Sequence, residues 1–205
     1  MKKHNDKSAQ TESADENNVK KEKLAHTALQ GERVSIRNFE AGDYQAFAEL
    51  FADEDVLYFY LPGKLQTYRG DALAELLADW NDLDTSFVFT VLQEDKPIGL
   101  ITCESVDFDM GHLETGIALI SVSERSRGLA TEAMNLFIAY LFQDLGLHRI
   151  NARIIGGNAA SVKLFQRLGF EHEGLQREFV RRGSTYLDMN LFGLLEQDWQ
   201  LKKRN

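Results

Sequence analysis

A short turn at residues 125–130, Arg-Ser-Arg-Gly-Leu-Ala, has the residue types of a phosphate-binding loop. It follows a strand-like run at residues 115–122 and leads into a stretch whose apolar residues recur at helical spacing. The first N–H groups of a helix lack acceptors within the helix and lie at the positive end of its dipole, so they bind anions. Gly128 leaves room for a phosphate because it has no Cβ. By itself the turn is also compatible with ordinary helix-entry chemistry. The candidate phosphate-binding residues are Arg125, Ser126, Arg127, Gly128, Leu129, Ala130 and Thr131.

A second motif lies downstream at residues 158–170, Asn-Ala-Ala-Ser-Val-Lys-Leu-Phe-Gln-Arg-Leu-Gly-Phe. Asn158 is a predicted N-cap, worth about 1 kcal/mol to its helix, and Gly169 is a predicted stop. The motif therefore predicts a short amphipathic helix close behind the first.

In this order the two motifs resemble the GNAT superfamily of N-acetyltransferases, whose turn holds the pyrophosphate of acetyl-coenzyme A. Residues 173–183, the Tyr-Leu-Asp at 186–188 and the tail ending at Trp199 further resemble the RimJ/RimL branch, which acetylates protein N-termini, notably those of ribosomal proteins. The resemblance spans about residues 32–199 and is strongest after Glu114. It implies a single α/β (α+β) domain with a central mixed, twisted sheet, flanking helices and two splayed central parallel strands.

The resemblance also implies how acetyl-CoA binds. Backbone groups near Ile120 and Val122 are expected to hold the pantetheine arm, with the thioester in the gap between the splayed strands. An asparagine at Asn158 would contact the cofactor as well as cap its helix. The spacing from Glu114 to Gly128 is one residue longer than usual, which predicts a bulge or a shifted register there.

Acetyl transfer to an amine needs a group that takes the amine's proton and a donor for the departing thiolate. By resemblance Glu178 is the expected base, although an ion pair with Arg177, Arg181 or Arg182 is an equal alternative. Glu114 is the second candidate, with a structural or substrate-orienting role favoured.

Many relatives carry a tyrosine acid where this chain has Phe165, which cannot donate a proton. The resemblance offers Ser161 instead, and plain packing of Ser161 in the first helical turn is the alternative.

Three functions follow. The first is acetyl-CoA-dependent N-acetylation of a protein or peptide α-amine. The second is the same chemistry on a small polyamine-like or aminoglycoside-like amine. The third is a non-catalytic acetyl-CoA-binding module, suggested by the missing tyrosine. The resemblance leaves a homodimer open.

Composition restricts the possible substrates, partners and cofactors. The chain has 205 residues and a net charge of −9, which disfavours direct nucleic-acid binding and suits a cationic amine. The single cysteine, Cys103, lies in an apolar run and predicts a buried strand residue rather than a nucleophile. His112 and His148 lack partners at ligand spacing, so no metal is expected. No segment has the pattern of a signal peptide or a membrane span, so a cytoplasmic protein without a membrane partner is expected.

The elements that must position these residues alternate along the chain. Residues 1–30 are polar and charged and predict a disordered tail, leaving residues 31–205 as the acetyltransferase domain. Helices are predicted at 42–51 and 67–80, on either side of an aromatic segment at 56–61 that either packs or lines an acceptor pocket. Strands are predicted at residues 33–37, 87–92, 98–106, 115–122, 149–155, 170–180 and 184–191.

Overall fold

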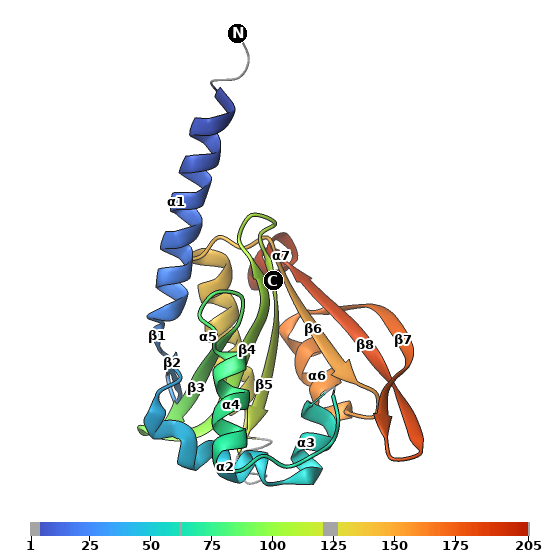
Figure 1. Cartoon of the computed structure of the whole chain (residues 1–205). Helices are drawn as coiled ribbons and strands as arrows, with labels where there is room; N and C mark the ends of the chain where they lie inside the picture. The colour runs from blue at the N-terminus through green and yellow to red at the C-terminus, as the bar shows by residue number, and fades with distance from the viewer. Residues whose placement is uncertain (1–4, 62, 121–126, 205) are drawn as a thin grey trace.

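The computed structural model describes residues 5–61, 63–120 and 127–204, with side chains from residue 13 to residue 203. Its strands form one eight-stranded sheet in the order β1-β2-β3-β4-β5-β6-β8-β7. Their bounds are β1 Ala28–Gln30, β2 Ser35–Asn38, β3 Phe87–Gln93, β4 Lys96–Asp107, β5 His112–Leu119, β6 Arg149–Ile155, β7 Glu171–Arg182 and β8 Thr185–Leu195. All neighbouring pairs run antiparallel except β5 and β6. The mixed sheet and its helices confirm the expected α/β fold (Figure 1).

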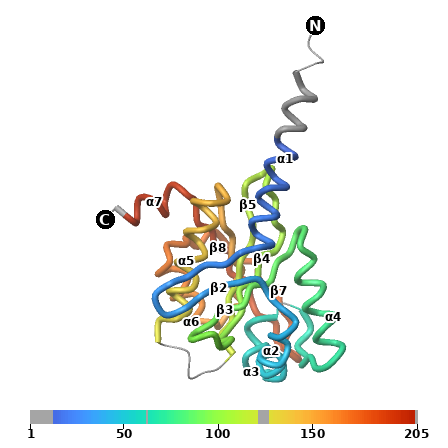
Figure 2. The backbone as a smooth tube through the Cα atoms, turned by 90° about the vertical axis from the view of Figure 1, so that its left-hand side faces the viewer, coloured from blue at the N-terminus to red at the C-terminus, as the bar shows by residue number. Residues whose placement is uncertain are grey.

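Helices cover both faces of the sheet (Figure 2). One face carries α2 Tyr44–Phe51, α3 Glu54–Tyr60 and α4 Asp71–Trp80. The other carries α5 Leu129–Gln143 and α6 Ala159–Leu168, with α7 Glu196–Arg204 following β8. A short 3-10 turn, Ala41–Asp43, precedes α2.

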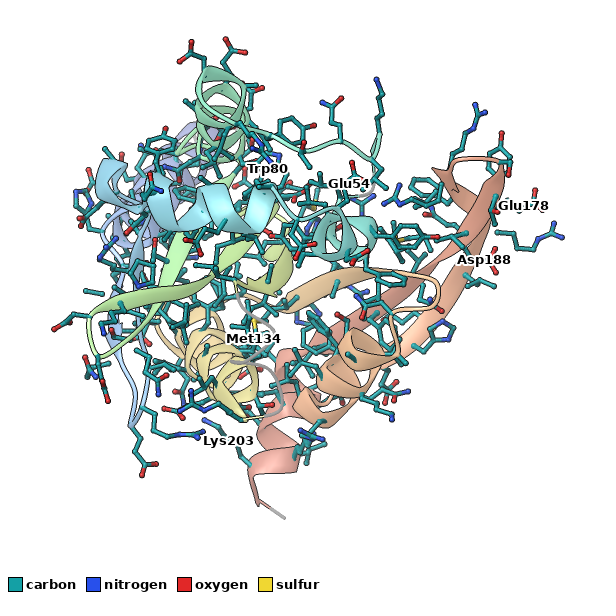
Figure 3. All side chains as sticks on the ribbon, turned by 90° about the horizontal axis from the view of Figure 1, so that it is seen from below. Glu54, Trp80, Met134, Glu178, Asp188 and Lys203 are labelled. Carbon is teal, nitrogen blue, oxygen red and sulfur yellow. The ribbon has the colours of Figure 1, made fainter. Side chains whose placement is uncertain are left out.

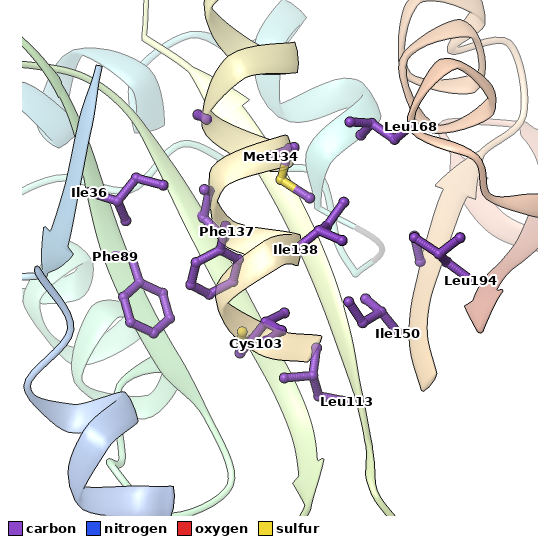
Figure 4. Close-up of a cluster of buried hydrophobic side chains, with 14 of the residues drawn as sticks. Ile36, Phe89, Cys103, Leu113, Met134, Phe137, Ile138, Ile150, Leu168 and Leu194 are labelled. Carbon is purple, nitrogen blue, oxygen red and sulfur yellow. The ribbon is translucent and has the colours of Figure 1, made fainter. Parts of the chain in front are cut away.

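The central strands are buried on both sides because each face has its own apolar layer. Along β3, Phe87, Phe89 and Val91 join the core under α5, while Val88 joins the core under α2 and α4. Successive strand residues point to opposite faces, so this near-continuous apolar run supplies both layers. Figure 4 shows Phe89 and Cys103 beside Phe137 of α5. Cys103 is fully buried, as predicted, and burial raises the pKa of its thiol.

The two parallel strands separate partway along their length. β5 pairs with β6 only through His112, Leu113 and Glu114, although both strands continue. On its other side β5 stays paired with β4 as far as Leu119. The separation therefore leaves a fork between β5 and β6, as the resemblance implied.

The N-terminal segment differs from the disordered tail predicted for residues 1–30. The structure has a helix, α1 Asn5–Ala25, that projects from the body and leads into edge strand β1 (Figure 1). Leu24 is fully buried and Lys21 contacts Asp84, so the base of this helix is packed on the domain. Composition pointed to disorder because apolar anchors are sparse in this segment, but one buried leucine and strand pairing hold it.

Other differences are local. The aromatic segment is helical, because Asp53 caps α3 by accepting bonds from the N–H groups of Asp55 (2.9 Å) and Val56 (3.3 Å). The helix predicted at 67–80 begins only at Asp71, after Gly70 with its positive φ of 53°. The bulge predicted between Glu114 and Gly128 does not occur as far as Leu119, where β5 keeps its register with β4, and residues 121–126 lie outside the described residues. A separate register shift lies in the same pairing between Glu104 and Asp107.

Candidate active site

A cavity of about 750 Å³ occupies the fork and is lined from both faces of the sheet. From one face come α3 and α4, with Tyr60 and Trp80. From the other come the first turn of α5 and most of the length of α6. Two ligands that enter from opposite faces would meet where β5 and β6 part.

The first turn of α5 lies at the cavity with the backbone geometry expected of a phosphate site. Gly128 caps the helix in the left-handed conformation, with φ 80°. Gly128, Leu129, Ala130 and Thr131 all line the cavity, in agreement with the sequence prediction. Glu132 anchors this turn by accepting bonds from Arg33 Nε (2.7 Å) and from the Arg33 N–H (2.6 Å).

Of the remaining residues predicted to bind the cofactor near this turn, the structure describes Arg127. The carbonyl of Arg127 accepts a bond from Arg33 Nη1 at 3.0 Å, and Arg127 is not among the cavity-lining residues. Arg125, Ser126 and Val122 lie outside the described residues. The N–H groups at the start of α5 nevertheless fit a pyrophosphate, so the site suits the cofactor that the resemblance implied.

The assignment of Ile120 to the pantetheine arm needs correction. Its N–H donates to the Ile98 carbonyl at 2.9 Å, so this donor is already used by β4. In an antiparallel pair alternate residues direct their backbone groups to the same neighbour. Ile117 and Leu119 therefore direct theirs toward the fork, and both line the cavity.

The start of α6 has the N-cap that the sequence predicted. Asn158 Oδ1 accepts a bond from the Ser161 N–H at 3.1 Å, which is the predicted N-cap. Asn158 and Ser161 both line the cavity. Phe165 also lines it, is buried and packs edge-on against Phe170, so no hydroxyl is present at that position.

The structure places Glu178 outside the cavity. It is exposed on β7, at a bulge with φ 53°, and its N–H donates to Asp188 Oδ1 at 2.8 Å. Figure 3 shows Glu178 and Asp188 on the outer hairpin, well apart from the cavity residue Trp80. The alternative role for Glu178, an ion pair with a nearby arginine, does not involve Arg182. The Arg182 guanidinium donates instead to the carbonyls of Tyr58, Leu61 and Gly63. Sequence proximity suggested an ion pair, whereas the hairpin turns this guanidinium back onto α3.

Two facing strand carboxylates line the cavity, Glu104 on β4 and Glu114 opposite it on β5, in addition to Asp55 of α3. Glu114 accepts a bond from Arg153 Nε at 2.8 Å. Burial raises the pKa of Glu104, the Glu114 charge raises it further, and Arg153 partly opposes both. Of the two, Glu104 is the one whose raised pKa makes it the better proton acceptor.

Aromatic side chains of α3 and α4 line the cavity together with these carboxylates. The rings of Tyr60 and Trp80 pack at 6.0 Å between centroids with an interplanar angle of 63°. Arg182 holds the C-terminal end of α3 in place, because its donors satisfy carbonyls at and after the last helical turn. Its ring contact with Tyr58, 5.4 Å from the centroid, adds to this clamp.

Sequence reasoning missed Glu104, and also Lys163 and Arg167, which are cavity residues on one face of α6. Tyr60 belongs to the aromatic segment that was expected either to pack or to line an acceptor pocket, and it lines the cavity. The basic pair at i and i+4 was a readable signal beside a predicted phosphate site. Glu104 had no such signal, since it meets Glu114 only through strand pairing.

Within the described parts of the chain, no group of three or more His, Cys, Asp or Glu side chains is arranged to hold a metal ion. The described helices include none with the length and apolar character needed to cross a bilayer.

Residues 33–171 match the family model described as "Acetyltransferase (GNAT) domain", and the chain belongs to this family. It is an acyltransferase by family. It is 27% identical over 177 residues to the uncharacterized N-acetyltransferase p20 of Bacillus licheniformis, a match that covers 83% of this chain and 97% of that protein. It is 33% identical over 75 residues to the ribosomal protein uS5-alanine N-acetyltransferase of Escherichia coli, covering 37% of this chain and 39% of that one.

Among solved structures, the spermidine N-acetyltransferase of Vibrio cholerae in complex with CoA and spermine superposes with a TM-score of 0.73. The two chains are 22% identical, and the match covers 82% of this chain and 98% of that one. This likeness establishes the shared fold.

Proposed function

We propose that this protein transfers the acetyl group of acetyl-CoA to the α-amine of a protein or peptide N-terminus. The observation that carries the proposal is the cavity itself, which joins the start of α5 on one face of the sheet to Glu104 on the other. The backbone at Gly128–Thr131 suits the pyrophosphate, and the carboxylate suits an amine arriving from the opposite side.

The charges around the cavity favour an acceptor with one amine. Glu114 is already paired with Arg153, and Asp55 is exposed at the start of α3. Glu104 is therefore the partly desolvated carboxylate without such a partner among the described residues. A polyamine carries several cations and would be better matched by several free carboxylates. The likeness of part of the chain to the uS5-alanine enzyme agrees with an α-amine, as do the motifs similar to the RimJ/RimL branch.

The residues divide the chemistry as follows. Bound acetyl-CoA supplies the acetyl group as a thioester. Glu104 accepts the proton that the amine nitrogen loses as its bond to the acetyl carbon forms and the carbon–sulfur bond breaks. Ser161 lines the cavity in the first turn of α6, and its hydroxyl would donate a hydrogen bond to the departing thiolate or to a water that protonates it. Asn158 fixes this turn by capping it.

A small polyamine is the second candidate, and Asp55 at the cavity is the observation that favours it. A thiol-release assay with acetyl-CoA separates the two. Short peptides with free α-amines are compared with the same peptides N-terminally blocked, and with spermidine. The proposal expects turnover of free peptides and little of spermidine. Preferential turnover of spermidine, lost in Asp55→Asn, would establish the second candidate.

A further inference from the structure

The turn between β1 and β2 is fastened to the first turn of α5 by a single carboxylate, that of Glu132. Its Oε1 accepts hydrogen bonds from the backbone N–H groups of Arg33 (2.6 Å) and Val34 (3.3 Å). Its Oε2 accepts a bond from Arg33 Nε at 2.7 Å. Arg33 and Glu132 are 99 positions apart in the chain, so this contact joins two distant segments at the start of α5.

The guanidinium of Arg33 also reaches the backbone that enters α5. Its Nη1 donates to the carbonyl of Arg127 at 3.0 Å, and a Cβ at Gly128 would lie 3.5 Å from its Nη2. In a trans peptide group the C=O and the N–H point in opposite directions. Because Arg33 holds the Arg127 carbonyl, the N–H of Gly128 is directed away from the guanidinium and is left for another acceptor.

The charge of Glu132 has a cost at this position. Glu132 lies in the first turn of α5, where a carboxylate favours the helix but repels any anion that binds at the same helix start. Its side chain is only 18% exposed, so solvent screens its charge incompletely. The positive charge of Arg33 at 2.7 Å compensates the carboxylate. The pair thus keeps the anchor without leaving a net negative charge beside the phosphate site.

We infer that Arg33 is a positioning residue for the pyrophosphate of acetyl-CoA. It cancels the charge of Glu132 and holds the Arg127 carbonyl, so that the Gly128 N–H is left for the phosphate. The inference rests on the proposed function, because it concerns the cofactor of that reaction. It has a consequence that a purely structural ion pair lacks: the two partners affect cofactor binding in opposite directions.

The test measures acetyl-CoA binding by calorimetry in the full chain. Arg33→Met should raise the Kd by about 5- to 30-fold, because the charge of Glu132 is then uncompensated beside the phosphates. Glu132→Gln should bind at least as tightly as the wild type, since the amide oxygen can still accept the backbone N–H bonds and Arg33 keeps its charge. The double variant should recover most of the loss, which gives the coupling between the two residues.

Two further variants serve as controls. Arg33→Lys keeps the charge and should lose less affinity than Arg33→Met. Arg149→Met removes a comparable pair, in which Arg149 Nη1 donates to Glu173 Oε1 at 2.8 Å, and neither residue lines the cavity. It should leave the Kd for acetyl-CoA unchanged. Melting temperatures of all variants show whether each one is folded.

S-Acetylpantetheine gives a readout that a structural role would not separate, because it carries the thioester without the phosphates. The KM for this compound should be the same in Arg33→Met and the wild type, whereas the KM for acetyl-CoA should rise. The rise should shrink at high salt, which screens the interaction between Glu132 and the phosphates. The KM for the acceptor, measured at saturating acetyl-CoA, should not change.

An unchanged Kd in Arg33→Met would overturn the inference. So would equal weakening in Arg33→Met and Glu132→Gln, or an equal effect of Arg33→Met on S-acetylpantetheine, because each would mean that the pair only supports the fold. If the wild type binds acetyl-CoA but acetylates no amine, the proposed function fails while the binding test still decides the role of Arg33. If the wild type binds no acetyl-CoA, both fail.

Discussion

Replacing Glu104 with Gln should lower the rate of catalysis without lowering the stability of the fold. If Glu104 takes the amine's proton, the substitution should lower kcat/KM by about 10²- to 10⁴-fold, the usual contribution of a general base. Gln keeps the shape of the side chain, and the start of α5 is untouched, so acetyl-CoA affinity should not change. Activity should partly recover at high pH, where more of the acceptor is already neutral.

The same substitution should not destabilise the fold at neutral pH. The folded state raises the pKa of Glu104 above its ordinary value of 4.5, through burial and the charge of Glu114. Folding therefore favours the protonated carboxyl, and this stabilisation is present below pH 4.5 and is lost as the pH rises through the raised pKa. Each unit of the rise corresponds to about 1.4 kcal/mol. Glu104→Gln is thus expected to melt at or above the wild-type temperature at pH 7–8, with the difference fading near pH 4.

Glu114→Gln is the matched comparison, because it changes the facing carboxylate on β5. Removing its charge should lower the pKa of Glu104 and move the acidic limb of the pH–rate profile to lower pH. It should also cost a little stability, at most about 1 kcal/mol, because Arg153 loses a partly exposed partner. The measurements are kcat/KM between pH 5 and 9 and melting curves over the same range. A Glu104→Gln variant that is less stable yet turns over like the wild type would refute the reasoning.

Three further predictions follow from the same structure. Gly128→Glu should abolish acetyl-CoA binding in calorimetry, because it puts a strained, negative residue at the helix start, whereas Gly146→Glu, also at positive φ but away from the cavity, should bind normally. Leu24→Ala should lower the free energy of unfolding by about 2–5 kcal/mol in urea titrations, and an unchanged midpoint would mean that α1 is not packed on the domain. Arg182→Met should raise the acceptor KM by at least about 5-fold without altering that for acetyl-CoA, because it frees the end of α3, and Arg181→Met, which loses one exposed bond to Gly183, is its control.

The half of the site that we propose for the cofactor could be predicted from the sequence because its residues lie close together in the chain. A strand, a turn with Gly128 and a helix, then a helix capped by Asn158, specify their own geometry within a few residues. Apolar periodicity likewise predicted most strands and α5, since each element must bury one face. The base of the N-terminal helix escaped prediction because one buried leucine carries little weight in a polar segment.

The acceptor half was decided by tertiary structure. Glu104 becomes a candidate base only because antiparallel pairing sets it opposite Glu114, and burial then raises its pKa. Tyr60 reaches the fork because both ends of α3 are held. Asp53 caps the start of the helix, and Arg182, which lies 122 positions after Tyr60 in the chain, binds the carbonyls at its C-terminal end. Glu178 matched the expected motif, yet a bulge in β7 leaves it on the outer hairpin. Sequence periodicity specifies which face of an element is apolar, but the partners of a polar side chain depend on strand register and on contacts between distant segments.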